Sequence, residues 1–205
     1  MLKTISLFSL LSVSSLFAND RIQPTLQMGF DWGGTTLATV QHDYEANNDI
    51  KAGEGLSFEA GATLNNPQTS MELQFLVGYK FNYDSASNGD VTWDTIPFTA
   101  LALFKADKWK FGGGATYHLN PHLSGSFSGY DASGTYFNDS VNDKYDNAVG
   151  AVAQIQYMAS DTLAFGLKGT FIEYKLKNDS SQTARGDSIG LLATYTFGNE
   201  RTTFR

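Results

Sequence analysis

The sequence has 205 residues, of which 17% are charged and 14% aromatic, and its formal net charge is −7 at pH 7. Because it contains no cysteine, disulfide scaffolds, thiol nucleophiles and thiolate metal sites are excluded, and the acidic balance argues against a nucleic-acid partner. The 20 glycines, the low charge and the lack of any apolar run beyond residue 18 long enough for a membrane helix favour a single β-rich domain.

Residues 1–18 have the features of a secretory signal peptide. Lys3 gives this stretch a positive start, residues 5–17 are mostly apolar, and Ala18 is the small residue expected at a cleavage site. The apolar part is too short to cross a bilayer as a helix. We therefore expect cleavage after Ala18, export to the cell envelope, and a mature chain of residues 19–205 that forms one domain.

Behind this segment, apolar residues recur at every second position, which is the period of a strand with one apolar face. In residues 108–120, for example, the odd positions from Trp109 to Leu119 are mostly apolar, whereas the even positions include Lys110, His118 and two glycines. The eight predicted strands are residues 25–42, 55–64, 71–83, 92–104, 108–120, 146–159, 162–177 and 186–197.

Two of these segments are irregular. The first contains Gly33 and Gly34 near its centre, so residues 25–42 form either one kinked strand or two short ones. In residues 162–177 the pattern changes after Phe171, where charged residues take the formerly apolar side.

The connections between the predicted strands alternate in length. The long ones are residues 43–54, 84–91, 121–145 and 178–185, and the short ones are residues 65–70, 105–107 and 160–161. If residues 25–42 count as one strand, an up-and-down meander places every long loop at one end and both termini at the other. Bacterial outer-membrane barrels have this layout. The predicted fold class is therefore all-β, an eight-stranded antiparallel up-and-down transmembrane β-barrel.

The polar face of the predicted strands indicates which side is the lumen. It carries eight glycines, and the lumen of an eight-stranded barrel is barely wide enough for side chains. It also carries three acids and three bases, which we expect to pair because an unpaired charge in a closed lumen is costly. This predicted lumen charge network consists of Asp31, Glu59, Glu72, Lys80, Lys110 and Lys168.

Aromatic residues near the ends of the predicted strands suit the interfacial girdles of a membrane barrel, where an amphipathic ring lies between hydrocarbon and water. The candidates are Trp32, Tyr83, Trp93, Trp109, Tyr157 and Phe197. We expect them on the outside of the barrel.

The pattern Ser188-x-Gly190-x-x-Ala193-x-Tyr195-x-Phe197 is similar to the terminal-strand signal by which outer-membrane barrels are recognised for assembly. Nearly the whole mature chain resembles the small eight-stranded outer-membrane barrels of the OmpA/OmpX-like class. The resemblance implies a monomer in the outer membrane of a Gram-negative cell, with lipid, lipopolysaccharide and the barrel assembly machinery as partners. One departure is the extension 198–205 after the usual terminal Phe, whose effect on assembly stays open.

Candidates for chemistry are few. Of the three histidines, only His122 has a serine, Ser124, at the His-x-Ser spacing of the barrel-type lipid A deacylases, and the pair stands at the start of a predicted loop. We therefore predict no catalytic residue, no cofactor and no metal site. The loop 121–145 combines acidic residues with the aromatic residues Tyr130, Tyr136, Phe137 and Tyr145, which are possible contacts for a partner.

These observations favour a non-enzymatic outer-membrane barrel with a structural role or a role in loop-mediated interaction. Two alternatives stay open. One is a lipid-modifying enzyme of the outer leaflet, similar to a lipid A deacylase, with His118 or His122 as the base. The other is a soluble, lipocalin-like ligand carrier, in which the apolar face points inward.

Overall fold

The computed structural model describes residues 22–40, 48–65, 69–86, 89–130 and 136–198. The predicted signal peptide, His42 and residues 199–205 of the C-terminal extension lie outside these ranges. Within them every regular element is a strand, and no helix is long and apolar enough to cross a membrane.

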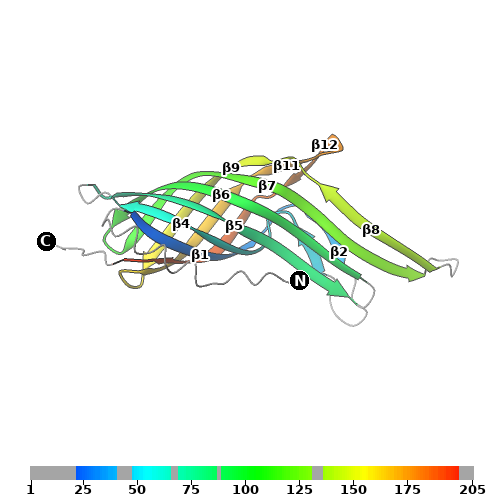
Figure 1. Cartoon of the computed structure of the whole chain (residues 1–205), viewed down its shortest axis with the longest axis horizontal. Coiled ribbons are helices and arrows are strands. Elements are labelled where there is room, and N and C mark those ends of the chain that lie inside the picture. The colour runs from blue at the N-terminus through cyan, green and yellow to red at the C-terminus, as the bar shows by residue number, and fades with distance from the viewer. Residues whose placement is uncertain (1–21, 41–47, 66–68, 87–88, 131–135, 199–205) are drawn as a thin grey trace, which may run out of the picture.

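Eight strands form the wall of a closed antiparallel barrel (Figure 1). In wall order they are β1 (Ile22–Trp32), β4 (Gly55–Asn65), β5 (Met71–Ala86), β6 (Gly89–Ala106), β7 (Trp109–Tyr130), β9 (Ala148–Met158), β10 (Leu163–Phe171) and β13 (Ser188–Thr196). The ring is closed because β1 pairs with β4 on one side and with β13 on the other. The predicted fold class is confirmed.

The two ends of the barrel differ. The turn end holds the start of β1, the end of β13 and the short connections that follow β4, β6 and β9. The loop end holds the remaining strands, β2 (Thr36–Val40), β3 (Asn48–Lys51), β8 (Tyr136–Lys144), β11 (Glu173–Leu176) and β12 (Asp179–Arg185). Since β2–β3 and β11–β12 are hairpins, the chain leaves and re-enters the wall at the same end, and long and short connections alternate as predicted.

Two segments predicted as candidate single strands are each divided in two. The described part of residues 25–42 contains most of β1 and all of β2, which are separated at Gly33 and Gly34, both with positive φ (124° and 93°). Residues 162–177 form β10 and β11, with Ile172 between them. The first hairpin therefore leaves the wall where glycine permits a left-handed backbone.

The connection predicted at residues 121–145 is wrong in one respect, because most of it is strand. β7 continues past the barrel to Tyr130, and β8 pairs with this outer half to form a projecting β7–β8 ribbon (Figure 1). The predicted connection 84–91 is likewise mostly strand, in β5 and β6. In neither stretch do apolar residues recur at every second position, so the sequence pattern did not predict these strands.

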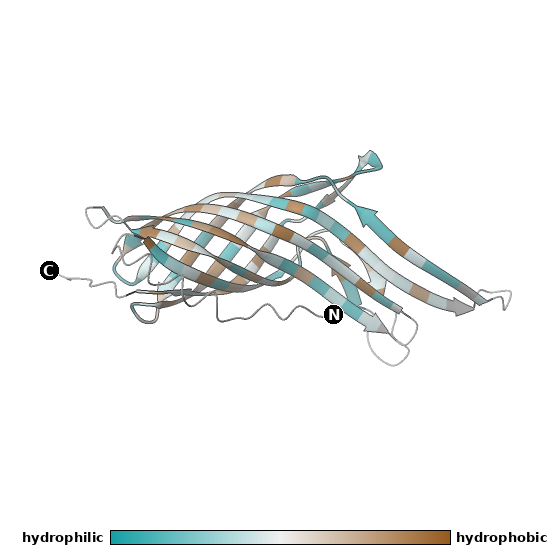
Figure 2. Cartoon of the chain, in the orientation of Figure 1, coloured by the Kyte–Doolittle hydropathy of each residue, from teal (hydrophilic) through white to brown (hydrophobic). Residues whose placement is uncertain are grey.

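Large apolar side chains cover the outside of the wall, and polar side chains fill its inside, so hydropathy alternates along the strands (Figure 2). Exposed examples are Leu26, Met28, Phe30, Leu73, Phe75, Val77, Phe98, Phe111, Ile155, Phe165, Leu167 and Leu191. Buried examples are Gln23, Thr25, Gln27, Thr63, Gln74, Thr99, Thr116, Gln154, Gln156 and Thr194. This is the arrangement of a transmembrane barrel. It contradicts the lipocalin-like alternative, which requires an apolar interior.

The arrangement reverses where β10 passes into β11. On the outward side, the exposed apolar Phe171 is followed two residues later by the charged Glu173. On the inward side, buried Thr170 is followed by buried Ile172 and Tyr174. Below this level the inside is mostly polar, apart from a small cluster of Leu101, Leu103 and Val152, and the outside is apolar. Above it, apolar side chains face inward. The reversal marks the level at which the surroundings change from hydrocarbon to water.

The outward position predicted for the aromatic residues is confirmed for four of them and wrong for one. Trp32, Tyr83, Trp109 and Tyr157 lie on the outside, with 40–54% of their surface exposed, and Phe197 is half-buried. Trp93 is fully buried inside the loop end. It lies above the level of the reversal, where apolar side chains face inward.

Candidate functional site

The six predicted lumen charges lie inside the barrel, each with at most 7% of its surface exposed. Four of them form an upper group nearer the loop end. Asp31 Oδ2 lies 2.8 Å from Lys80 Nζ and 3.3 Å from Lys168 Nζ, and Lys168 Nζ lies 3.6 Å from Glu59 Oε1. Two acids and two bases therefore balance one another and join β1, β4, β5 and β10 across the lumen.

The other two charges form a lower group nearer the turn end, and a third residue joins them. Glu72 Oε2 lies 2.9 Å from Lys110 Nζ and 3.1 Å from Lys105 Nζ. Lys105 is not among the predicted lumen charges. The signal that could have found it is alternation, because Leu101 and Leu103 on the same strand point inward and Lys105 continues that side.

The upper group leaves little free space. A cavity of about 20 Å³ lies between its members and His118, which is room for about one water molecule. Asp31 Oδ1 and Glu59 Oε2 are buried and have no hydrogen-bond partner among the described residues. Such a cavity does not admit an organic substrate, so the geometry suits a group that holds strands together.

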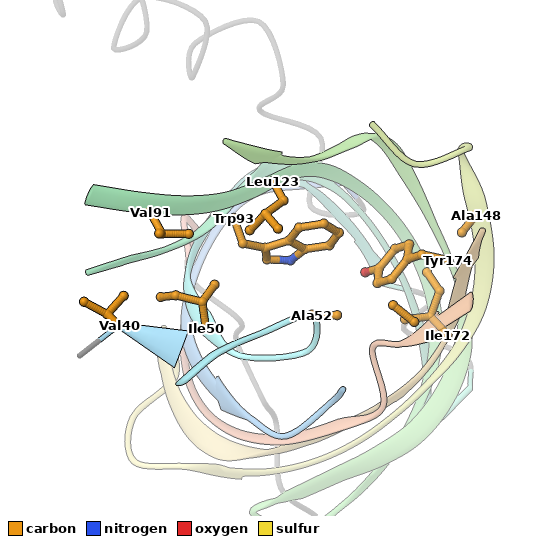
Figure 3. Packing of buried hydrophobic residues seen from close by; sticks show 10 residues of the cluster. Val40, Ile50, Ala52, Val91, Trp93, Leu123, Ala148, Ile172 and Tyr174 are labelled. Atoms are coloured by element: carbon orange, nitrogen blue, oxygen red, sulfur yellow. The ribbon is translucent and has the colours of Figure 1, made fainter. Parts of the chain in front are cut away.

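An apolar cluster closes the lumen at the loop end (Figure 3). This cluster, which we call the cap, consists of Val40, Ile50, Ala52, Val91, Trp93, Leu123, Ala148, Ile172, Tyr174 and Ala184. At its centre, the ring of Trp93 lies 5.3 Å from the ring of Tyr174 and 5.3 Å from that of Tyr145, in edge-to-face contact. The cap therefore joins the β2–β3 and β11–β12 hairpins to the outer parts of β6 and β7.

Two hydrogen bonds connect the cap and its loops to the lumen below. Tyr174 Oη lies 2.8 Å from His118 Nδ1, and Lys80 Nζ donates to the Gly53 carbonyl over 2.6 Å. Both lumen residues are buried. His118 thus has a structural partner in the cap.

The cap gives a first testable prediction. Trp93→Ala removes its largest side chain, and we expect a loss of about 3–5 kcal/mol of stability, confined mainly to the hairpins. In reconstituted protein, trypsin should then cut faster at Lys51, Lys177 or Arg185, while the unboiled protein keeps its folded migration in SDS gels. Trp109→Ala is the matched control, because Trp109 lies on the outside near the turn end. Equal cleavage rates in the two variants would contradict the role given to the cap.

The His122–Ser124 pair lies on β7 beyond the membrane-facing wall. His122 Nε2 lies 3.0 Å from Asn142 Oδ1, and His122 Nδ1 lies 3.7 Å from Asp94 Oδ1. Nε2 is thus engaged by Asn142 and not by Ser124, whereas a general base must reach the hydroxyl it activates. Within the described residues, no group of three or more His, Asp or Glu side chains is arranged to hold a metal ion.

The β7–β8 ribbon is the largest projecting element of the described chain (Figure 1). β8 is the last strand of its sheet, and no backbone hydrogen bond is made along its outer edge from residue 137 to residue 143 within the described ranges. Phe127 and Tyr136 expose 40% and 58% of their surface. The side chains of Tyr130 and Phe137, two predicted contact residues, lie outside the described part. Tyr145, a third, packs against Trp93 of the cap.

The β11–β12 hairpin carries an ordered acidic turn outside the membrane-facing wall. Ser181 Oγ donates to Asp179 Oδ1 over 2.6 Å, and Gln182 Nε2 donates to Asp179 Oδ2 over 3.0 Å. These hydrogen bonds stabilise the carboxylate and lower the pKa of Asp179 below its ordinary value.

The polar lumen, the apolar belt and the closed ring decide the class of fold. It is a small eight-stranded barrel of the outer-membrane type. No family model and no curated protein matches the sequence. Among solved structures, similarity is found to Neisserial surface protein A (NspA), with a TM-score of 0.46 and 12% identity over 86% of this chain and 97% of that one. A second similar structure is that of Ail, the attachment invasion locus protein of Yersinia pestis, in complex with the heparin analogue sucrose octasulfate. Its TM-score is 0.43, and its sequence is 12% identical over 86% of this chain and 98% of that one. The strand pairing and the distribution of polar and apolar side chains define the fold.

Proposed function

We propose that the protein is a non-catalytic component of the outer membrane of a Gram-negative cell, and that it acts through contacts made by its β7–β8 ribbon. The observation that carries the proposal is the contrast between the two parts of the barrel. The lumen is filled with ion pairs and closed by the cap, whereas the ribbon extends beyond the loop end with an unpaired edge.

The apolar belt and the layout of the connections support placement in the outer membrane. Both described chain ends and the short turns lie at one end of the barrel, as in barrels whose short turns face the periplasm. On this proposal the cap and the ribbon face the cell exterior, lipid and lipopolysaccharide surround the belt, and the barrel assembly machinery inserts the chain as a monomer.

Membrane fractionation tests this placement. The protein should be recovered with outer membranes, and unboiled protein should migrate differently in SDS gels from boiled protein because the closed barrel resists SDS. Recovery in the soluble periplasmic fraction without a heat-dependent shift would contradict it.

An unpaired strand edge supports interaction with an extended protein segment. Such an edge presents free N–H and C=O groups that can pair with an added strand. On β8 these groups are flanked by the exposed aromatic side chain of Tyr136 and by Asp139 and Asp143. The chain thus offers backbone hydrogen bonds together with side chains for contact.

Shortening the ribbon tests its role. In the described pairing, Gly125 lies opposite Val141 and Leu123 lies opposite Asp143. Residues 126–140 can therefore be replaced by an Asn-Gly hairpin turn without removing Leu123 from the cap. We expect the full-length protein to confer adhesion on intact cells through the ribbon, and the shortened protein to keep its heat-dependent gel shift and to lose that adhesion. If adhesion is unchanged, the ribbon is not the interacting element.

A single introduced cysteine gives an independent test, since the chain has none. Ser140 on β8 and Ser181 on the β11–β12 hairpin are both exposed. A photo-crosslinker attached to Ser140→Cys should give a crosslinked species on intact cells, and the same reagent on Ser181→Cys should not. Equal crosslinking from both positions would indicate non-specific proximity.

A further inference from the structure

A groove interrupts the apolar belt on the outer wall near the loop end. It has a volume of about 630 Å³ and lies across β1, β13, β10 and β9. Its sides are formed by large apolar residues, namely Trp32, Ile155, Leu167, Phe171 and Ile189. Its floor includes Ala153 and Gly169, and Asp187 and Ser188 line it as well. The volume lies in the range of small-ligand sites, about 300–1,000 Å³.

Beyond the groove, a row of small residues continues from this floor across the wall. Gly169 pairs with Ala153, Ala153 with Gly113, and Gly113 with Ala102. These four small residues point outward on β10, β9, β7 and β6. Because barrel strands tilt by about 35–45° from the barrel axis, a row perpendicular to them runs obliquely. It descends from the outer end of β1 toward the turn end, where Ala102 lies close to the end of β6.

At position 169, neither the backbone conformation nor the packing of neighbouring atoms requires a glycine. Its φ is not in the left-handed region, and an added Cβ would meet only Phe171 Cε2, at 3.9 Å. By contrast, a Cβ on Gly61, Gly114 or Gly166 would collide with the carbonyl oxygen of a neighbouring strand. Glycine weakens a strand interior and often marks a place where a ligand approaches the backbone. At Gly169 its effect is to leave the groove open.

The surroundings of the groove determine what can occupy it. The groove is continuous with the belt, whose interface is with bilayer hydrocarbon, so its occupant must be apolar over most of its length. Its outer end is lined by Trp32, a residue type that favours the membrane interface, and by Asp187 and Ser188, which are polar. A molecule with an apolar chain and a polar head at the outer interface matches both features.

We propose that this groove binds one acyl chain of an outer-leaflet lipid, with the chain lying obliquely over Gly169 and Ala153 and its polar head near Asp187 and Ser188. The inference requires the barrel to lie in a membrane, as proposed above, but is independent of any role of the ribbon. Binding of this kind would distinguish one lipid from the mobile lipids around the rest of the belt.

Native mass spectrometry of the full-length protein, extracted from its own membrane in mild detergent, tests the proposal. We expect the unmodified barrel to carry one lipid, and Gly169→Leu, which fills the groove, to lower the bound fraction at least tenfold. Ala153→Leu fills the floor on the neighbouring strand and should act in the same way. Ala60→Leu is the matched control, because Ala60 lies on the outer face of β4, away from the groove.

Each outcome of this experiment either supports or overturns the proposed lipid site. Loss of lipid in both groove variants, with retention in Ala60→Leu and an unchanged heat-dependent gel shift in all three, supports the proposal. It is overturned if the unmodified barrel carries no lipid, or if the groove variants keep as much as Ala60→Leu does. A dimer that disappears in the groove variants would identify a second copy of the chain as the occupant and would also overturn it. The ribbon-shortened protein should retain the lipid, which separates this result from the test of the ribbon.

Discussion

Replacing Asp31 with asparagine is expected to lower the free energy of unfolding by about 3–5 kcal/mol, the cost of breaking a buried ion pair from one side. Asp31 is the carboxylate nearest to Lys80 and one of two beside Lys168. Asparagine keeps the shape of the side chain, so the effect reports the lost charge and not a new cavity. The measurement is the urea midpoint of the barrel in lipid vesicles, followed by loss of the SDS-resistant band.

Two comparisons make this result specific to the lumen. Asp179→Asn changes the same residue type at an exposed turn and should alter stability by no more than about 0.5 kcal/mol. Removing both charges of a pair, with Asp31→Leu and Lys80→Leu together, should destabilise less than Asp31→Asn alone, because no Lys80 amine is left without a partner and Lys168 keeps Glu59. If Asp31→Asn and Asp179→Asn unfold at the same urea concentration, the upper group does not stabilise the barrel.

The second large effect is expected at Gly114. A Cβ there would collide with the Ala100 carbonyl oxygen on β6, which is fixed in the wall by strand pairing. Gly114→Ala should therefore destabilise the barrel by about 1–3 kcal/mol through overpacking and lower the fraction that folds in vesicles. The readout is the proportion of the heat-modifiable species after refolding.

Gly169→Ala is the control for this prediction, and its expected sign is opposite. The added methyl group meets only ordinary contact, and alanine is favoured over glycine in a strand by about 0.5–1 kcal/mol. The refolded fraction should equal or exceed that of the unmodified chain. Similar losses at both positions would mean that glycine is needed for chain flexibility during assembly and not for packing in the wall.

The alternation of apolar and polar residues was sufficient to predict most strands of the barrel wall. One face of each strand meets lipid and the other meets the lumen, so the two faces differ in polarity. The same rule placed Asp31, Glu72 and Lys168 on the polar face, and the structure brings them to their ion-pair partners. Which charges pair could not be predicted from the sequence. Asp31 and Lys80 lie on β1 and β5, which are not neighbours in the wall, so their contact depends on the width of the closed ring.

The alternation of apolar and polar residues did not predict the inward and outward faces correctly where the surroundings change along a strand. Trp93 lies on the inward face of β6, in line with buried Thr95 and Thr99. Beyond the membrane level this inward face becomes apolar and forms the cap, so an apolar side chain there does not mark the outside of the barrel. The β7–β8 ribbon was missed for a related reason. Both of its faces are largely accessible to water, so its strands have no apolar period, and backbone pairing alone makes them strands.

The reversal of polarity between Phe171 and Glu173 has a consequence for how the molecule responds to bilayers of different thickness. Sliding outward by one residue pair would expose Phe171 to water, and sliding inward by the same amount would carry Glu173 into hydrocarbon. Both displacements are unfavourable, so the depth of immersion is fixed at this boundary. Because this boundary is fixed, the mismatch with a thicker bilayer falls at the turn end, where the lipid must thin locally around the barrel at a cost of a fraction of a kcal/mol per ångström. The barrel thus keeps its position relative to the interface at the loop end, and the neighbouring lipids adjust at the turn end.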